Sequence, residues 1–144
     1  MPESVKLIFP TISPRLKSVE GEKFIWDSLR GKWLVLTPEE WVRQHTIGWL
    51  VTHKGIPALR ITQEYPVKIN GLNQRADIVV VDEKAKPHIL VECKAPDVIL
   101  DHEVVMQAIR YNSIVGARYI LLTNGLKLYG YEYADGKYRG LKEF

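Results

Sequence analysis

Residues 75–81 read Arg-Ala-Asp-Ile-Val-Val-Val, and residues 89–94 read Ile-Leu-Val-Glu-Cys-Lys. The run from Ile78 to Val81 is apolar at every position, which is typical of a strand buried on both faces of a sheet. The polar segment 83–87 predicts a turn. We therefore expect two neighbouring strands, at residues 74–82 and 88–94, that pair as a hairpin.

The segments on either side predict helices and further strands. Thr37 is a suitable N-cap and Pro38 a suitable first helical residue, so a helix is expected from there to about Lys54, where Gly55 ends it. The other expected elements are a hairpin of residues 24–26 and 33–36, a strand at 61–69, a helix at 101–115, a strand at 119–122, and a terminal hairpin of residues 126–133 and those after 136.

This order predicts an α/β fold with an αβββαβ core. Three consecutive strands suggest an antiparallel meander, and a crossover helix then brings the last main strand into parallel pairing. The expected sheet is mixed, four-stranded and flanked by helices, with an N-terminal hairpin and a C-terminal β extension. Residues 24–144 are expected to form a single domain, and residues 1–23 an irregular arm, because Pro2, Pro10 and Pro14 disfavour a helix there.

Composition says more about the cellular location of the protein than about its function. The 144-residue chain has a formal net charge of +3, which permits a nucleic-acid partner without arguing for one. A single cysteine, Cys93, excludes an internal disulfide. The N-terminus has no signal-peptide pattern, and no apolar stretch reaches the roughly 20 residues of a membrane span. We therefore expect a cytoplasmic protein that makes no membrane contact.

Polar residues at the ends of the two central stretches carry the chemistry. Because side chains alternate along a strand, Glu92 and Lys94 share one face and Cys93 points to the other. In a hairpin, Asp77 is then expected beside Glu92 and Lys94. Two adjacent carboxylates repel each other unless a cation neutralises them, and Mg²⁺ prefers oxygen ligands. The pattern predicts metal-dependent phosphodiester hydrolysis, in which Lys94 orients the attacking water or stabilises transition-state charge.

Each of these residues also has a simpler interpretation when it is taken singly. Glu92 and Lys94 would suit a salt bridge on an exposed strand, and Asp77 would suit a turn that opens a strand. Cys93 is better explained as a small core residue than as a nucleophile. The histidines have no Cys or His neighbours at zinc spacing, so no zinc site is expected.

Four segments in order resemble a known family. Asp77 followed by Glu92-Cys93-Lys94 resembles the Asp…Glu-x-Lys motif of the restriction-endonuclease-like superfamily. Together, segments 37–44, 75–80, 91–96 and 123–125 resemble the N-terminal nuclease domain of type I restriction enzyme motor subunits. The likeness is closer to small stand-alone bacterial proteins that carry this domain, and it covers about residues 24–130.

The resemblance implies a catalytic set, which consists of Asp77, Glu92, Lys94 and Gln107. It also implies Mg²⁺ or Mn²⁺ as the cofactor. The implied metal ligands are Asp77, Glu92, the backbone carbonyl of Cys93 and an acid of the first helix, for which Glu40 is the first choice and Glu39 the second. Glu40 is explained equally well as a helix-capping acid.

Three further residues are candidates for contact with DNA: Arg75, Tyr111 and Arg43. Gln107 and Tyr111 lie one helical turn apart and share a helix face. The family pattern places them near the water around the metal or at a DNA phosphate, and simple cover of the sheet is the alternative. Arg75 shares a face with Asp77, so it either pairs with Asp77 or binds phosphate.

The expected function is hydrolysis of DNA phosphodiester bonds in restriction, defence or DNA processing, with RNA as an alternative substrate. A second hypothesis is a catalytically silent module of the same fold that binds nucleic acid or a partner. The resemblance also implies a motor or specificity protein as partner. A homodimer is a further expectation, because many relatives cut two strands as pairs of subunits.

Overall fold

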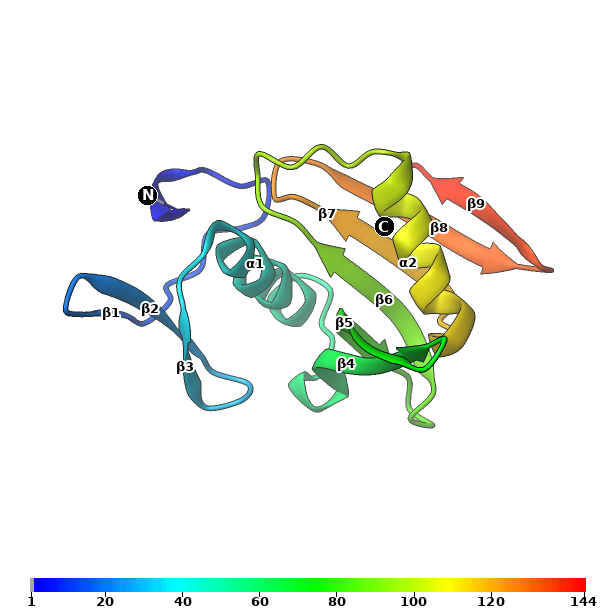
Figure 1. Cartoon of the computed structure of the whole chain (residues 1–144), viewed down its shortest axis with the longest axis horizontal. Helices are drawn as coiled ribbons and strands as arrows, with labels where there is room; N and C mark the ends of the chain where they lie inside the picture. Colours follow the sequence, from blue (N-terminus) through cyan, green and yellow to red (C-terminus); the bar gives the residue numbers. More distant parts are fainter. Residues whose placement is uncertain (1) are drawn as a thin grey trace.

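The computed structural model describes residues 2–144 and is built around one large mixed sheet with two helices (Figure 1). A short 3-10 turn, η1 (Pro2–Ser4), precedes strands β1 (Leu16–Val19), β2 (Glu22–Asp27) and β3 (Lys32–Val35). Then follow α1 (Pro38–Thr52), η2 (Ala58–Arg60), β4 (Ile61–Ile69), β5 (Leu72–Val81), β6 (Pro87–Cys93), α2 (His102–Val115), β7 (Tyr119–Thr123), β8 (Leu128–Ala134) and β9 (Lys137–Leu141).

The main sheet confirms the predicted αβββαβ core. Its six strands lie in the order β4-β5-β6-β7-β8-β9. Only β6 and β7 pair in parallel, and α2 connects them as the crossover helix. The predicted C-terminal extension, β8 and β9, continues this sheet beyond the predicted four strands.

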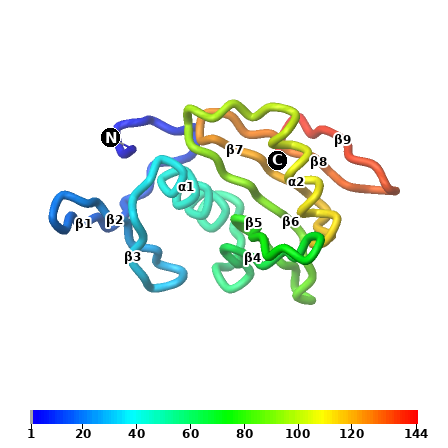
Figure 2. The backbone as a smooth tube through the Cα atoms, in the orientation of Figure 1, coloured from blue at the N-terminus to red at the C-terminus, as the bar shows by residue number. Residues whose placement is uncertain are grey.

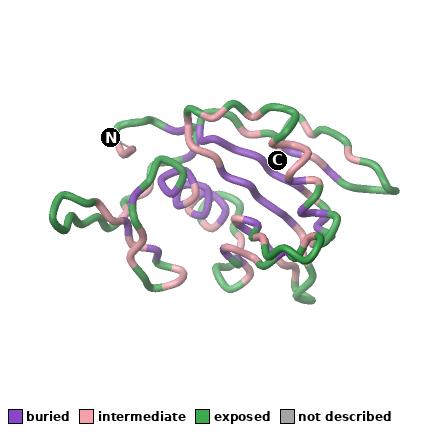
Figure 3. The backbone as a smooth tube through the Cα atoms, in the orientation of Figure 1, coloured by how far each residue is buried: buried purple, intermediate pink, exposed green. Residues whose placement is uncertain are grey.

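The centre of the sheet is buried on both faces, as its apolar sequence predicts (Figure 3). On one face, Val42 and Leu50 of α1 belong to the same core as Val91 of β6. On the other, Ala108 of α2 belongs to a second core with Leu90. Burying each Leu or Val side chain contributes about 1.5–3 kcal/mol to folding, so β6 is held by apolar packing on both of its faces.

Both helices begin with a side-chain cap. The Thr37 hydroxyl accepts the Glu40 backbone N–H at 3.0 Å, as the sequence predicts, and Asp101 caps α2 in the same way. Helix α2 ends at Gly116, whose φ of 76° is easily adopted only without a Cβ. No helix of the described chain is long and apolar enough to span a membrane.

The N-terminal segment is more ordered than the sequence predicts. Residues 1–23 were expected to be irregular, but Leu16–Val19 forms β1 and pairs antiparallel with β2. The prediction was wrong because every β1 residue is exposed, so the strand has no apolar alternation to reveal it. The predicted hairpin of β2 and β3 is confirmed.

A buried carboxylate attaches this small three-stranded sheet to the large one. Asp27 is fully buried and accepts hydrogen bonds from the Arg30 Nε at 2.7 Å and from the Gln63 Nε2 of β4 at 3.1 Å. Arg30 also donates to Glu64 of β4. Burial opposes ionisation of Asp27, but the hydrogen bonds from Arg30 and Gln63 outweigh it and lower its pKa.

Asp27→Ala is expected to lower the free energy of unfolding at pH 7 by about 3 kcal/mol, because it leaves Arg30 and Gln63 without their acceptor. Since the folded pKa of Asp27 lies below the unfolded value, this stabilisation is complete at neutral pH and is lost as the pH falls through the folded pKa. Urea unfolding at neutral and acidic pH measures both effects. Asp135→Asn, in an exposed turn, is the control. A deficit below about 0.5 kcal/mol at pH 7 would contradict the role of Asp27 as the attachment.

Candidate active site

The ladder between β5 and β6 stops at Ile78 and Val91, one residue before Asp77 and Glu92. Two bonds to side chains take the place of the next rung. The Asp77 backbone N–H donates to Glu92 Oε1 at 3.3 Å, and the Cys93 backbone N–H donates to Asp77 Oδ2 at 2.7 Å. Beyond this point β5 still pairs with β4, and β6 still pairs with β7. The sheet therefore opens between β5 and β6 where the two acids stand.

The facing direction of the side chains changes along β5 at this opening, because Ala76 and Val79 belong to the same α2-side core although three positions separate them. Leu90 of β6 also belongs to the α2-side core, and Glu92 stands two residues along from it. Cys93 belongs instead to the α1-side core, where its thiol donates to the Thr46 hydroxyl. Burial, followed by the charge of Asp77, raises the pKa of Cys93 well above its ordinary value. Cys93 therefore stays a neutral thiol and does not act as a nucleophile.

Glu92 and Asp77 are held together against their mutual repulsion. Glu92 is 7% exposed. Burial, followed by the neighbouring Asp77 carboxylate, raises the pKa of Glu92 to about 9, and the charge of Lys94 opposes this shift only in part. Without a bound cation, Glu92 therefore carries a proton at neutral pH.

Lys94 brings a positive charge to this pair. Its backbone N–H donates to the Thr123 carbonyl at 2.9 Å, which fixes the residue beside β7. Its ammonium acts electrostatically on Glu92 and on Glu39, and no acceptor contacts it within residues 2–144. Asp77 and Glu92 thus lie side by side at the opening, and the charge of Lys94, two residues after Glu92, acts on Glu92.

The two candidate acids of α1 have different partners. The Glu40 carboxylate is buried and accepts from Arg43, at 3.0 Å for Nε, and from Gln44 at 2.9 Å. Glu39 lies at the exposed start of the helix. Partial burial, followed by the charge of Asp77, raises the pKa of Glu39, and Lys94 opposes the shift. Glu40 is thus engaged by residues one turn along its own helix, whereas the charges of Asp77 and Lys94 act on Glu39, and this difference favours Glu39 over the predicted first choice, Glu40, as a metal ligand.

Arg43 and Arg75 lie at the border of the site. Arg43 pairs with Glu40. Arg75 is exposed and lies 3.7 Å from Glu64, rather than pairing with Asp77. The pairing of β4 with β5 skips Glu64 and Asp77, which lie between the pairs Gln63–Ile78 and Tyr65–Ala76, and the hydrogen bond from Arg30 lowers the pKa of Glu64. The sequence gives no sign of Glu64 or Arg30, because the two residues are 34 positions apart.

Gln107 and Tyr111 share a helix face, as predicted, and bond to each other. The Gln107 amide donates to the Tyr111 hydroxyl at 2.8 Å, and that hydroxyl donates to Gln74 Oε1 at 3.5 Å. Gln74 lies on β5, three residues before Asp77. The pair is therefore fixed to the strand that carries Asp77, through a glutamine that the sequence analysis did not identify.

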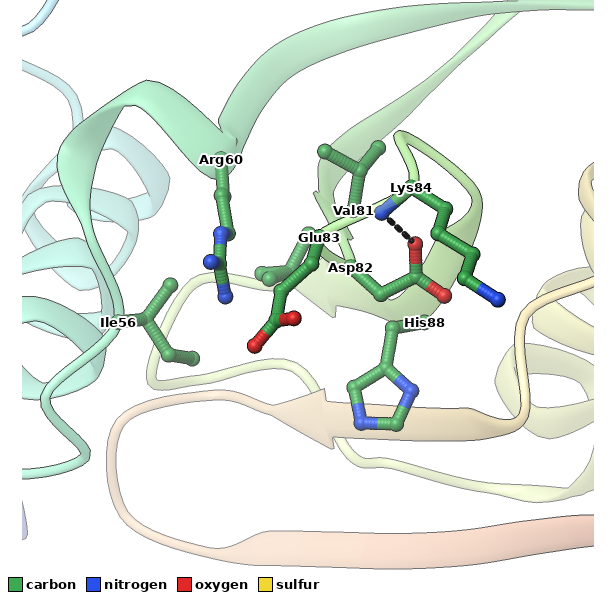
Figure 4. A pocket seen from close by; sticks show the side chains of 8 residues that line it. Ile56, Arg60, Val81, Asp82, Glu83, Lys84 and His88 are labelled. Carbon is green, nitrogen blue, oxygen red and sulfur yellow. Dashed lines mark hydrogen bonds between the residues drawn. The ribbon is translucent and has the colours of Figure 1, made fainter.

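A surface pocket of about 390 Å³ lies elsewhere, at the far end of β5 and β6 (Figure 4). Arg60, Glu83 and His88 line it. Asp82, which follows the last residue of β5, is about 17 Å along the chain from Asp77. Backbone N–H groups of Lys86 and Lys84 lower the pKa of Asp82, so this carboxylate holds the turn together. The pocket is separate from the candidate site.

Comparison with protein families gives one match. The family model described as "Type I restriction enzyme R protein N terminus" matches residues 38–144. No curated protein matches the chain.

Three solved structures are similar. One is a fragment assigned as an HsdR subunit of a type I restriction enzyme from Vibrio vulnificus YJ016, with 24% identity, a TM-score of 0.46, and coverage of 58% of this chain and 18% of that one. The type IIG restriction endonuclease BpuSI has 18% identity, a TM-score of 0.49, and coverage of 67% and 11%. A protein from Anabaena variabilis ATCC 29413, assigned as a DUF820 nuclease, has 13% identity, a TM-score of 0.49, and coverage of 94% and 80%. This chain therefore spans only a small part of the first two proteins.

Asp77→Asn is expected to raise the free energy of unfolding by about 1 kcal/mol in metal-free solution. The change removes a negative charge beside Glu92, while the asparagine oxygen can still accept the Cys93 N–H. Urea unfolding of chelator-treated protein measures the difference. Asp77→Ala is the control; it lacks the acceptor and is expected to be about 1 kcal/mol less stable than Asp77→Asn. If Asp77→Asn proves less stable than the wild type, repulsion between the two acids is not a feature of the site.

Proposed function

Because this chain belongs to the family of the type I restriction enzyme R protein N terminus and has a restriction-endonuclease-like fold, we propose that it is a metal-dependent nuclease that hydrolyses DNA phosphodiester bonds. In this proposal Asp77, Glu92 and Lys94 form the active site. The observation that carries the proposal is the pair of cross-strand bonds that joins the two acids where β5 and β6 part.

The donor atoms suit Mg²⁺ or Mn²⁺ held by few protein ligands. Within residues 2–144, no three His, Cys, Asp or Glu side chains form a preassembled metal cluster. Magnesium does not require one, because it usually keeps several waters and binds one or two carboxylates together with a substrate phosphate. The carboxylates of Asp77 and Glu92 and the backbone carbonyl of Cys93 would hold the ion, with Glu39 as the nearest further acid. A cation there would replace the proton that burial favours on Glu92.

The residues of the chain would position the reaction. When bound, the metal supplies Lewis acidity that polarises the phosphoryl oxygen and lowers the pKa of water. Lys94, whose charge acts on Glu92, would orient the attacking water and stabilise negative charge on the phosphoryl group. As the bond from water to phosphorus forms, the bond to the leaving sugar oxygen breaks, and that oxygen takes up a proton. Gln107, held by Tyr111, would contact the substrate phosphate or its water.

In this proposal, other proteins select the DNA that the domain cleaves. The family is that of the type I restriction enzyme R protein N terminus, so a motor or specificity protein would bring the substrate to this domain. Cleavage of both DNA strands would need a second copy of the chain or two successive events. RNA is the alternative substrate and is included in the test below.

Purified protein is expected to cleave DNA in the presence of Mg²⁺ or Mn²⁺. Asp77→Asn and Lys94→Ala are each expected to lower the cleavage rate at least about 100-fold, because each removes a group that acts on the phosphoryl centre. Plasmid DNA, single-stranded DNA and RNA are tested side by side. Lys84→Ala, in the turn at the other end of β5, is the matched control and should keep the rate within about twofold. Intact substrates in every reaction, with binding retained, would favour the silent binding module instead.

Metal binding is expected to stabilise the fold through the same residues. If the dissociation constant is about 1 mM, then about 10 mM Mg²⁺ raises the free energy of unfolding by about 1.4 kcal/mol. Asp77→Asn should abolish this increase, and Glu39→Gln should reduce it. Glu40→Gln should retain it even if the variant starts from a lower stability. Urea unfolding with and without metal measures the increase for each variant, and an increase lost in Glu40→Gln but kept in Glu39→Gln would restore Glu40 as the ligand.

A further inference from the structure

The small sheet of β1, β2 and β3 presents a face of aromatic and basic side chains. This sheet precedes the residues matched by the family model, which begin at 38, and it extends from one end of the molecule (Figure 2). In its register Lys17 stands opposite Phe24 and Trp26 opposite Trp33, so these four side chains share one face. Ile25 points the other way and is fully buried in the core.

The cations of this face lie directly over the rings. The Arg15 guanidinium carbon is 5.0 Å from the centre of the Trp26 ring and 5.5 Å from that of Trp33. The Lys17 ammonium is 4.5 Å from the centre of the Trp33 ring and 5.7 Å from that of Phe24. The two indole rings meet edge to face at 5.2 Å. The five side chains, Arg15, Lys17, Phe24, Trp26 and Trp33, therefore form one continuous surface, here called the aromatic-basic face.

The positive charges of the aromatic-basic face are not neutralised within residues 2–144. The ion pairs of that part of the chain do not include Arg15 or Lys17. Both residues are exposed, and their side chains are held by rings instead of by carboxylates. A cation that is already ordered loses less conformational entropy when it binds an anion. The face therefore suits a polyanion that also carries flat apolar groups.

The aromatic-basic face is fixed relative to the candidate active site. Asp27 and Arg30, from β2 and the turn after it, bond to Gln63 and Glu64 of β4. Gln63 pairs with Ile78 of β5, the residue next to Asp77. A groove of about 440 Å³ continues from the face, with Arg15 and Trp26 on one wall and residues of α1, the helix that carries Glu39, on the other.

We propose that the aromatic-basic face binds a single-stranded segment of the nucleic acid on which the enzyme acts. This inference rests on the proposed nuclease function. Arg15 and Lys17 contact phosphates, and unpaired bases stack on Trp33 and its neighbours. Aromatic side chains stack on bases of any sequence, but only where the bases are not paired within a duplex. The strand bound here is thereby held beside α1, toward the opening between β5 and β6.

Binding is tested by fluorescence anisotropy with a labelled oligothymidylate of about 12 nucleotides, in EDTA, so that cleavage plays no part. The double variant Arg15→Gln/Lys17→Gln is expected to bind at least about tenfold more weakly in about 50 mM salt. Its plot of log K against log salt should be shallower by about 1.4, which corresponds to two lost phosphate contacts. The matched control, Lys84→Gln/Lys137→Gln, removes the same charge at exposed positions away from the face and should bind within about twofold of the wild type.

Tryptophan emission tests the stacking separately. Trp41 and Trp49 are each 8% exposed, so quenching by added oligothymidylate reports on the half-buried Trp26 and Trp33. An abasic oligomer of equal length should bind without this quenching, and Trp33→Leu should lose most of the quenching together with affinity. Circular dichroism confirms that each variant is folded, and Arg15→Lys, which keeps the charge, should retain binding.

Two results would overturn the inference. One is that a duplex of equal length binds as tightly as the single strand. The other is that the Arg15→Gln/Lys17→Gln variant binds like its control. A failure of the wild-type protein to cleave any substrate would count against the proposed nuclease function alone, because the binding assay contains no divalent metal.

Discussion

The structure depends on the place in the main sheet where β5 and β6 stop pairing with each other. Between β5 and β6 the next pair of residues after Ile78 and Val91 is Asp77 and Glu92, and their carboxylates accept the backbone N–H groups of Cys93 and Asp77. Every donor at this position is therefore satisfied by a side chain, so no ladder bond forms there. The strands part, and two adjacent acids remain at the opening, where burial and the charge of Asp77 favour a proton on Glu92 when no cation is bound. The two cores on either side of β6 supply a free energy that offsets the cost of this arrangement.

A hydrogen bond from the end of β7 holds the loop that follows Lys94. Asn124, just beyond β7, donates to the Val98 carbonyl at 2.9 Å and accepts the backbone N–H groups of Leu126 and Lys127. Gly125 follows with a φ of 83°, and a Cβ there would lie 2.7 Å from Leu7. The short segment 123–125 therefore ties the loop after β6 to the end of β7 and to the N-terminal chain, which places Lys94 relative to the acids without a direct bond to its amine.

The helices and strands that the sequence predicts correctly depend on residues close together in the chain. The site residues that it does not predict depend on contacts between distant segments. The apolar run at 78–81, the Thr37 cap and the Gly116 terminator each act within a few residues, and the elements they predict end within about two residues of those observed. Hairpin geometry likewise predicts that Asp77 meets Glu92. Gln74, Glu64 and Arg30 were not identified, because their partners come from other elements. The choice between Glu39 and Glu40 as a metal ligand stays a prediction, because both fit the first turn of a helix and only their side-chain partners in the fold distinguish them.

The arginines around the site form ion pairs with some of its acids and leave the others without an arginine partner. Within residues 2–144, Arg30 and Arg43 form ion pairs with Glu64 and Glu40, and Arg75 adds to the first of these pairs. Of the acids near the opening, Asp77, Glu92 and Glu39 form no ion pair with an arginine in the described part of the chain, and the charge of Lys94 acts on Glu92 and Glu39. When the three acids are all ionised and Lys94 is protonated, their net charge is −2. A divalent cation carries the matching charge, so the pairing of the arginines elsewhere is itself an argument that the proposed metal belongs between β5 and β6.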